Sequence, residues 1–126
     1  MIEKEFIIYV IDDDASVRRA FLLLLQSAEF KVETFSSANE FLESVRPSDR
    51  AVIILDMKLP GITGLDLLKQ LEPRISGIQI IAITALDDVM TQELARELGA
   101  VAFFQKPVDG QALIDTIWWV MGGKGN

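Results

Sequence analysis

The stretch Phe6–Asp14, FIIYVIDDD, joins a short apolar run to three consecutive carboxylates. Two more short runs rich in β-branched residues follow it, at Ala51–Leu55 and Ile78–Ile83. Runs of this length without polar alternation are typical of parallel strands that helices cover on both faces. The sequence therefore predicts a parallel sheet with carboxylates directly after its first strand.

Weaker patterns complete the predicted fold. Lys31–Phe35 alternates polar and apolar residues, which places it at an edge of the sheet, and Val101–Phe104 is the shortest strand. Amphipathic helical patterns lie between the strands. Their predicted inward residues are, helix by helix, Val17, Phe21, Leu24, Leu25 and Ala28; Leu65, Leu68 and Leu71; Met90, Leu94 and Leu98; and Leu113, Ile114, Ile117, Val120 and Met121. A strand–helix unit repeated five times predicts a doubly wound α/β fold, (βα)5, with three layers.

Polar residues and one glycine mark the predicted helix boundaries. Ser37 and Glu40 have the spacing of a capping box. Asp14 and Asp109 stand where N-caps are expected, and Gly99 where a helix ends.

The composition excludes several classes of function. The 126 residues contain no cysteine and no histidine, which excludes disulfide frameworks, zinc ribbons, thiol nucleophiles and the Ser-His-Asp triad. The formal net charge of −7 disfavours autonomous binding to nucleic acid or to an anionic membrane. No apolar run is long enough to cross a bilayer and the N-terminus lacks a signal peptide, so we expect a cytoplasmic domain.

The candidate site is found at the ends of the predicted strands, because ligands of such folds bind beyond the carboxyl ends of the strands. Asp12 and Asp13 follow the first strand, Asp56 the third, Thr84 the fourth and Lys106 the fifth. Crowded carboxylates repel one another, and Mg²⁺ or Mn²⁺ relieves that repulsion. Asp56 is the predicted nucleophile, since an aspartate can carry a phosphoryl group, while Lys106 and Thr84 would bind phosphoryl oxygens.

These residues resemble the receiver domain of two-component response regulators, over about residues 5 to 121. The matching motifs are Val10-Ile11-Asp12-Asp13-Asp14, Leu55-Asp56-Met57-Lys58-Leu59-Pro60-Gly61 followed by Gly64, Ile83-Thr84-Ala85, and Lys106-Pro107. The resemblance implies a flavodoxin-like sheet of order 2-1-3-4-5 with five helices. It also implies a receiver domain over residues 1–121, followed by a flexible tail or the start of a linker at 122–126. The chain is then either a single-domain regulator or the receiver of a longer one.

The resemblance further implies phosphorylation of Asp56 by a sensor histidine kinase or phosphotransfer protein, in a Mg²⁺-dependent reaction without turnover of an external substrate. The cation would be held by Asp13, Asp56 and the backbone carbonyl of Lys58. Asp12 would act mainly through a metal-bound water.

A conformational switch is also implied. Phosphorylation would move Thr84 and the ring of Phe103, and so change the surface formed by the fourth helix, fifth strand and fifth helix. Lys58 and Leu86 occupy two positions that affect how water reaches the acyl phosphate in this family.

Two surfaces are candidate interfaces. Trp119 lies roughly opposite the inward stripe of the last helix, with Trp118 at its margin, and we expect a phosphorylation-dependent homodimer there. The alternative is that both tryptophans cover the rim of the sheet. Arg18 and Leu22, on the first helix, are the candidate docking site for the kinase.

Two other functions are compatible with parts of the sequence. A phosphohydrolase of the haloacid-dehalogenase type also uses two strand-end aspartates, here Asp12 and Asp14. It needs an acidic pair after Thr84, where Asp87 and Asp88 look instead like the start of a helix. A receiver that signals by binding alone is disfavoured by the intact acidic, hydroxyl and lysine set. The residue that takes up phosphate separates these functions.

Overall fold

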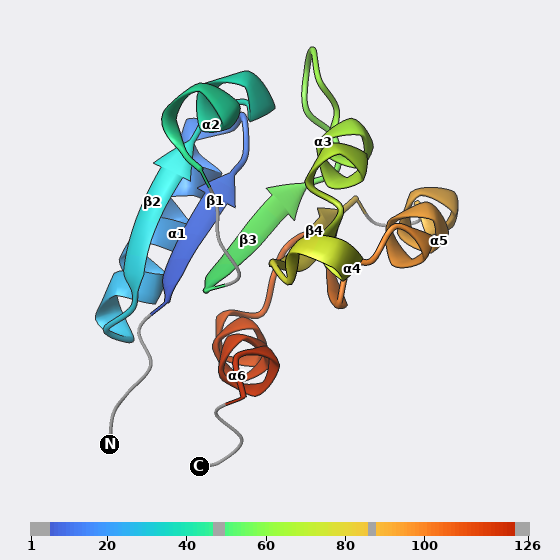
Figure 1. The fold of residues 1–126 in the computed structure, drawn as a ribbon. Coiled ribbons are helices and arrows are strands. Elements are labelled where there is room, and N and C mark those ends of the chain that lie inside the picture. The colour runs from blue at the N-terminus through green and yellow to red at the C-terminus, as the bar shows by residue number, and fades with distance from the viewer. Residues whose placement is uncertain (1–5, 47–49, 86–87, 123–126) are drawn as a thin grey trace.

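The computed structural model describes residues 6–46, 50–85 and 88–122 (Figure 1). Among these residues, five parallel strands form a sheet of order β2-β1-β3-β4-β5. The strands are β1 (Ile7–Ile11), β2 (Lys31–Phe35), β3 (Ala51–Asp56), β4 (Gln79–Thr84) and β5 (Ala102–Gln105). The predicted strand order and the edge position of Lys31–Phe35 are therefore confirmed.

The helices in the described residues are α1 (Ala15–Ser27), α2 (Ala38–Ser44), α3 (Gly64–Leu71), α4 (Pro73–Ser76), α5 (Val89–Glu97) and α6 (Gly110–Val120). All but α4 were predicted. Pro73 begins this extra turn inside the α3–β4 connection, because proline ends α3 yet suits the first turn of a new helix. None of these helices combines the length and apolarity that a membrane span requires. Leu86, Asp87 and most of the predicted tail, residues 123–126, lie outside the described residues.

Helices cover both faces of the sheet and complete three layers (Figure 1). Phe21 and Leu25 of α1 pack with buried residues of α6 on one face. On the other face, Phe41 of α2 and Leu68 of α3 pack with Ala95 of α5. Alternate residues of β1, β3 and β4 enter the two clusters in turn, which explains why these strands are continuously apolar. The arrangement is the doubly wound, flavodoxin-like fold that the sequence predicts.

The predicted inward stripe is right for α1 and α6, but at the α5 end of the sheet it is right only for Leu98, which is partly buried and packs against the core. On α5, Met90 is 74% exposed and Leu94 is also exposed, whereas Ala95 is fully buried. The small side chain of Ala95 lies against the sheet, and Met90 and Leu94 turn to solvent as a result.

The helix caps at Asp14, Asp109 and Gly99 form as predicted. The capping box at Ser37 and Glu40 forms only in part. Ser37 Oγ accepts from the Glu40 amide at 3.0 Å, as expected. Glu40 Oε1, however, accepts from the amide and the hydroxyl of Ser36, at 2.7 and 2.9 Å, rather than from the Ser37 amide. Two donors on Ser36 satisfy this carboxylate better than the single N–H of the cap residue.

Candidate functional site

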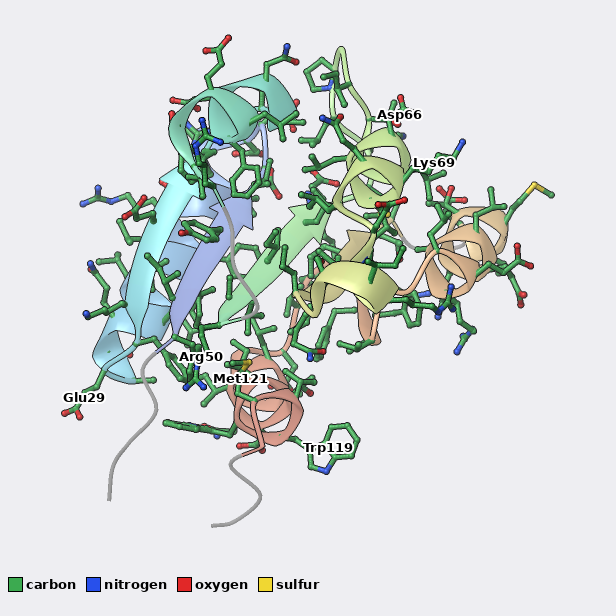
Figure 2. The ribbon with its side chains drawn as sticks, viewed as in Figure 1. Glu29, Arg50, Asp66, Lys69, Trp119 and Met121 are labelled. Atoms are coloured by element: carbon green, nitrogen blue, oxygen red, sulfur yellow. The ribbon has the colours of Figure 1, made fainter. Side chains whose placement is uncertain are left out.

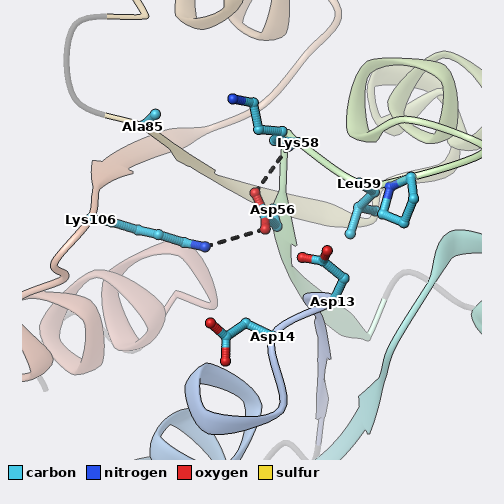
Figure 3. Close-up of a pocket in the computed structure, with 8 residues that line it drawn as sticks. Asp13, Asp14, Asp56, Lys58, Leu59, Ala85 and Lys106 are labelled. Atoms are coloured by element: carbon cyan, nitrogen blue, oxygen red, sulfur yellow. Dashed lines mark hydrogen bonds and ion pairs between the residues drawn. The ribbon is translucent and has the colours of Figure 1, made fainter.

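A pocket of about 410 Å³ lies at the carboxyl end of the sheet (Figure 3). It collects residues from the ends of β1, β3, β4 and β5, as the sequence predicts for a site in this fold. The lining residues are Asp13, Asp14, Asp56, Lys58, Leu59, Pro60, Ala85 and Lys106.

Three carboxylates converge at this pocket. Asp12, Asp13 and Asp56 each place one oxygen within 4.8 Å of the other two. Asp12 and Asp56 are buried, and Asp13 is exposed. Burial raises the pKa of Asp56, the amide of Lys58 acts against this, and the charge of Asp12 raises the pKa further. The site thus holds negative charge that is costly without a cation.

Each oxygen of Asp56 has its own partner (Figure 3). Oδ1 accepts from the Lys58 amide at 3.0 Å, and Oδ2 accepts from Lys106 Nζ at 3.3 Å. Lys106 Nζ also lies 3.2 Å from Asp12 Oδ2. Partial burial acts to lower the pKa of Lys106, but the charges of Asp56 and Asp12 outweigh it and raise that pKa. Lys106 is therefore held as an ammonium between two carboxylates.

The donor set fits a Mg²⁺ ion. Asp12 Oδ1 accepts from the Asp14 amide at 2.9 Å. Asp12 Oδ2 is buried, and within the described residues it accepts no hydrogen bond of good geometry beyond its ion pair with Lys106. A buried carboxylate oxygen in this state, beside the oxygens of Asp13 and Asp56 at an open pocket, matches the all-oxygen ligands and bound waters that Mg²⁺ prefers.

Asp12 and Asp14, the two aspartates that the phosphohydrolase alternative would use, are placed differently from Asp56 at the pocket. Asp12, the nucleophile in that alternative, is buried and is not among the residues that line the pocket. Asp14 lines the pocket, but its Oδ1 accepts from the amides of Ser16 and Val17 and so caps α1. Asp56 is the buried carboxylate that lines the pocket.

Gly64 lets α3 begin close behind the site. A Cβ on Gly64 would lie 2.6 Å from both Asp56 O and Met57 Cα, far inside contact distance. The glycine that follows the Asp56 motif is thus required by a close approach of two backbones.

Thr84 and Phe103 lie on the strands beside the pocket. Thr84, the last residue of β4, is buried, and its neighbour Ala85 rather than Thr84 lines the pocket. Phe103 on β5 is partly buried, with Arg96 Cζ of α5 4.8 Å from the centre of its ring. This cation–π contact was not predicted, because Arg96 reads as a surface charge in the sequence. The side chain of Lys58 points away from Asp13, toward the side of Ala85 (Figure 3).

The candidate interface residues differ in exposure. Trp119 is 72% exposed and projects from α6 (Figure 2), whereas Trp118 is 48% exposed and contacts the rings of Phe6 and Phe30. Trp118 therefore covers the rim of the sheet, and Trp119 does not.

On α1, Leu22 is partly buried and Leu23 is 55% exposed. Arg18 is also partly buried, and its Nη1 donates to the backbone oxygen of Asp12 at 2.9 Å. Sequence reasoning missed this contact, since nothing in the order of residues indicates which way Arg18 turns.

Comparison with known proteins agrees with this geometry. The model of the response regulator receiver domain matches residues 8–118. The transcriptional regulatory protein FixJ of Azorhizobium caulinodans is 40% identical over 110 residues, which cover 87% of this chain and 52% of that protein. The chain thus spans about half the length of the curated relatives it matches.

Solved structures give the same result. The structure of the response regulator StyR is 42% identical and has a TM-score of 0.83, with 94% of this chain and 60% of that chain covered. The crystal structure of FixJ-N is 29% identical with a TM-score of 0.83, and covers 94% of this chain and 95% of that one. The chain belongs to the response regulator receiver domain family of two-component signal transduction.

Proposed function

We propose that Asp56 accepts a phosphoryl group from the phosphohistidine of a sensor kinase or phosphotransfer protein, in a Mg²⁺-dependent reaction in the cytoplasm. The observation that carries this proposal is the position of Asp56, which lines the pocket beside the carboxylates of Asp12 and Asp13 and pairs with the ammonium of Lys106. The product is a signalling state of this chain, so no external substrate is turned over.

The transfer is an in-line displacement at phosphorus. Asp56 Oδ2 attacks, a new O–P bond forms, and the P–N bond of the phosphohistidine breaks with its electron pair moving to the imidazole. The product is an acyl phosphate on Asp56. Lys106 Nζ, 3.3 Å from Oδ2, lies where it can neutralise an oxygen of the arriving group.

The remaining site residues orient and bind. Asp13, Asp56 and the backbone carbonyl of Lys58 would hold Mg²⁺, with Asp12 acting through a water, and the ion would supply charge neutralisation of the phosphoryl oxygens. The Thr84 hydroxyl would donate to the phosphoryl group. The exposed side chain of Lys58 then sets, with Leu86, how water reaches the acyl phosphate.

The phosphoryl group would act as a switch. Movement of Thr84 toward it would open space that the Phe103 ring fills by turning inward, away from Arg96. The surface of α5, β5 and α6, which corresponds to the fourth helix, fifth strand and fifth helix of the family pattern, would change and control a partner or an output domain.

The kinase docks, in this proposal, on α1 at the surface that carries Leu22 and Arg18. A groove of about 500 Å³, which neither Leu22 nor Arg18 lines, lies between α1 and the end of β5, with Phe21, Leu24 and Pro107 among its apolar lining. Lys106 lines both this groove and the Asp56 pocket, so an apolar partner helix bound here would bring its phosphohistidine close to Asp56.

Homodimerisation after phosphorylation would use the surface that includes Trp119, whose exposed ring is suited to anchor an interface. Trp119→Ala should then abolish self-association in the presence of a phosphoryl mimic, as measured by analytical ultracentrifugation. Self-association at the wild-type level in this variant would contradict the assignment.

Acetyl phosphate, a small phosphodonor, tests the proposed function without a kinase. We expect incorporation of phosphate that requires Mg²⁺, is lost in Asp56→Asn, and is slowed strongly in Asp13→Asn and Lys106→Met. Incorporation that survives in Asp56→Asn, or a wild-type chain that takes up none, would contradict it. A chain that takes up none would instead support the binding-only receiver.

A further inference from the structure

Arg18 connects the first turns of α1 to the loop that carries Asp12 and Asp13, two members of the acidic cluster. Its Nη1 donates to Asp12 O at 2.9 Å, and the residue is partly buried. Side chains of a helix lean toward its N-terminus, which allows Arg18 to reach back past the N-cap Asp14. The side chain thus contacts the backbone of the site rather than extending into solvent.

This bond completes the restraint of Asp12. The Asp12 amide donates to Phe35 O at 3.1 Å, and Asp12 Oδ1 accepts from the Asp14 amide at 2.9 Å. The amide, the backbone oxygen and Oδ1 of Asp12 thus each have a partner, and Oδ2 faces Lys106 and the other carboxylates of the acidic cluster.

The carbonyl that Arg18 holds also controls the next residue. Asp12 O and the Asp13 amide belong to one planar peptide unit, so the orientation of the carbonyl sets that of the amide and the direction in which the chain leaves toward the Asp13 side chain. A guanidinium bound to Asp12 O therefore acts on both carboxylates of the β1–α1 loop.

Arg18 has a second anionic neighbour on α2. Hydrogen bonds from the amide and hydroxyl of Ser36 lower the pKa of Glu40, and the charge of Arg18 lowers it further. The negative charge of Glu40 attracts the guanidinium, and this favours the position in which Arg18 donates to Asp12 O.

We propose that Arg18 is a positioning residue for cation binding, because its bond to Asp12 O orients the peptide between Asp12 and Asp13. The proposal rests on the proposed function, since the cation serves phosphorylation of Asp56. It differs from docking, which needs only the surface of α1.

Removal of the guanidinium should change the affinity for Mg²⁺ in opposite directions, depending on whether Arg18 acts as a positioning residue or only through its charge. Removal of a positive charge near an acidic site strengthens Mg²⁺ binding by electrostatics alone. Loss of an outer partner that orients the ligands weakens it, typically by 10-fold or more. Arg18→Met removes the donor and keeps an apolar stem, and Arg19→Met removes the same charge from an exposed neighbouring position.

The experiment is a calorimetric Mg²⁺ titration of wild type, Arg18→Met, Arg18→Gln and Arg19→Met, with acetyl phosphate reactions at varied Mg²⁺ beside it. We expect both Arg18 variants to bind Mg²⁺ about 10-fold more weakly, and Arg19→Met to bind as tightly as wild type or more so. Half-maximal phosphorylation should need correspondingly more Mg²⁺ in the Arg18 variants, with a maximal rate close to that of wild type. Arg18→Gln decides the result if Arg18→Met does not fold.

An unchanged or lower Mg²⁺ Kd in the Arg18 variants would overturn the positioning role, even if the thermal midpoint fell. Unchanged Mg²⁺ binding together with slower transfer from a kinase would assign Arg18 to docking instead. Absence of Mg²⁺ binding in the wild-type chain would overturn the proposed function itself, and the Arg18 proposal with it.

Discussion

Lys106 Nζ lies 3.3 Å from Asp56 Oδ2, so that residues fifty positions apart are joined by an ion pair across β4. The pair leaves Asp56 Oδ1 to the Lys58 amide. Both oxygens of the central carboxylate are therefore oriented before any phosphodonor arrives. This preorganisation lowers the cost of placing the nucleophile, which is the main task of a protein in phosphoryl transfer.

The raised pKa of Asp56 predicts a pH-dependent stability. Burial raises this pKa, the Lys58 amide opposes the rise, and the charge of Asp12 adds to it. A carboxyl group whose folded-state pKa is raised costs stability when it ionises, so stability falls as the pH rises from about 4 through the folded-state pKa. At pH 7 without Mg²⁺, Asp56→Asn should unfold several degrees above wild type, which corresponds to about 1 kcal/mol in a domain of this size.

Thermal unfolding in a chelator, at pH 4 and pH 7, measures this effect. The difference in unfolding temperature between Asp56→Asn and wild type should widen from pH 4 to pH 7. Asp115→Asn, which removes an exposed carboxylate on α6, should show no such gap. A gap that is equal at both values of pH would contradict the assigned cause.

Gly64→Ala should disturb both the fold and the site. The added Cβ would meet Asp56 O and Met57 Cα at 2.6 Å, and these backbone atoms cannot move aside as a flexible side chain can. We expect a loss of about 2–3 kcal/mol in the free energy of unfolding by urea, together with weaker Mg²⁺ binding.

Gly110→Ala is the matched control. Its Cβ would lie 3.1 Å from the side chain of Leu24, which can shift. The loss in the free energy of unfolding should therefore stay below about 1 kcal/mol. Equal losses in the two variants would show that the approach of α3 to β3 is not the cause.

The two tryptophans of α6 should differ in their contribution to stability. The Trp118 ring centre lies 5.0 Å from that of Phe30 and 6.2 Å from that of Phe6, so Trp118→Ala should cost about 1–3 kcal/mol in guanidinium unfolding. Trp119→Ala removes an exposed ring and should change stability by less than about 0.5 kcal/mol. A large loss for Trp119→Ala would mean that this ring stabilises the monomer rather than an interface.

Arg96 should hold the Phe103 ring in the position that it has in this structure. A cation–π contact at an exposed site contributes about 0.5–1 kcal/mol, or a factor of about 2–5 in an equilibrium. If activation moves the ring away from Arg96, Arg96→Gln should bind beryllofluoride, a phosphoryl mimic, about 2–5-fold more tightly. Lys69→Gln on α3 should bind it as wild type does. Unchanged affinity in Arg96→Gln would show that the contact does not bias the switch.

Local pattern explains why the strand order, the main helices and the position of the acidic site were predictable. Continuous apolar runs such as β3 indicate a parallel sheet covered on both faces, and parallel strands place the residues that follow them at one edge. Asp56 and Lys106 meet for this reason although they are far apart in the chain.

The missed features depend on how side chains fit together in three dimensions. An inward stripe was assigned to α5 by the helical spacing of Met90, Leu94 and Leu98, but the small Ala95 is the fully buried residue of this helix and Met90 is exposed. Arg18 and Arg96 read as surface charges, yet one binds a backbone oxygen of the site and the other covers the Phe103 ring. Such contacts are made between elements, and the periodicity of one element does not encode them.

The most direct test of the central claim is to locate the phosphoryl group. The chain is incubated with acetyl phosphate and Mg²⁺, the acyl phosphate is reduced with borohydride to homoserine, and the modified residue is identified by mass spectrometry of peptides. We predict modification at Asp56 in the wild-type chain and none without Mg²⁺. Modification at Asp12 or at another carboxylate, with Asp56 intact, would contradict the account.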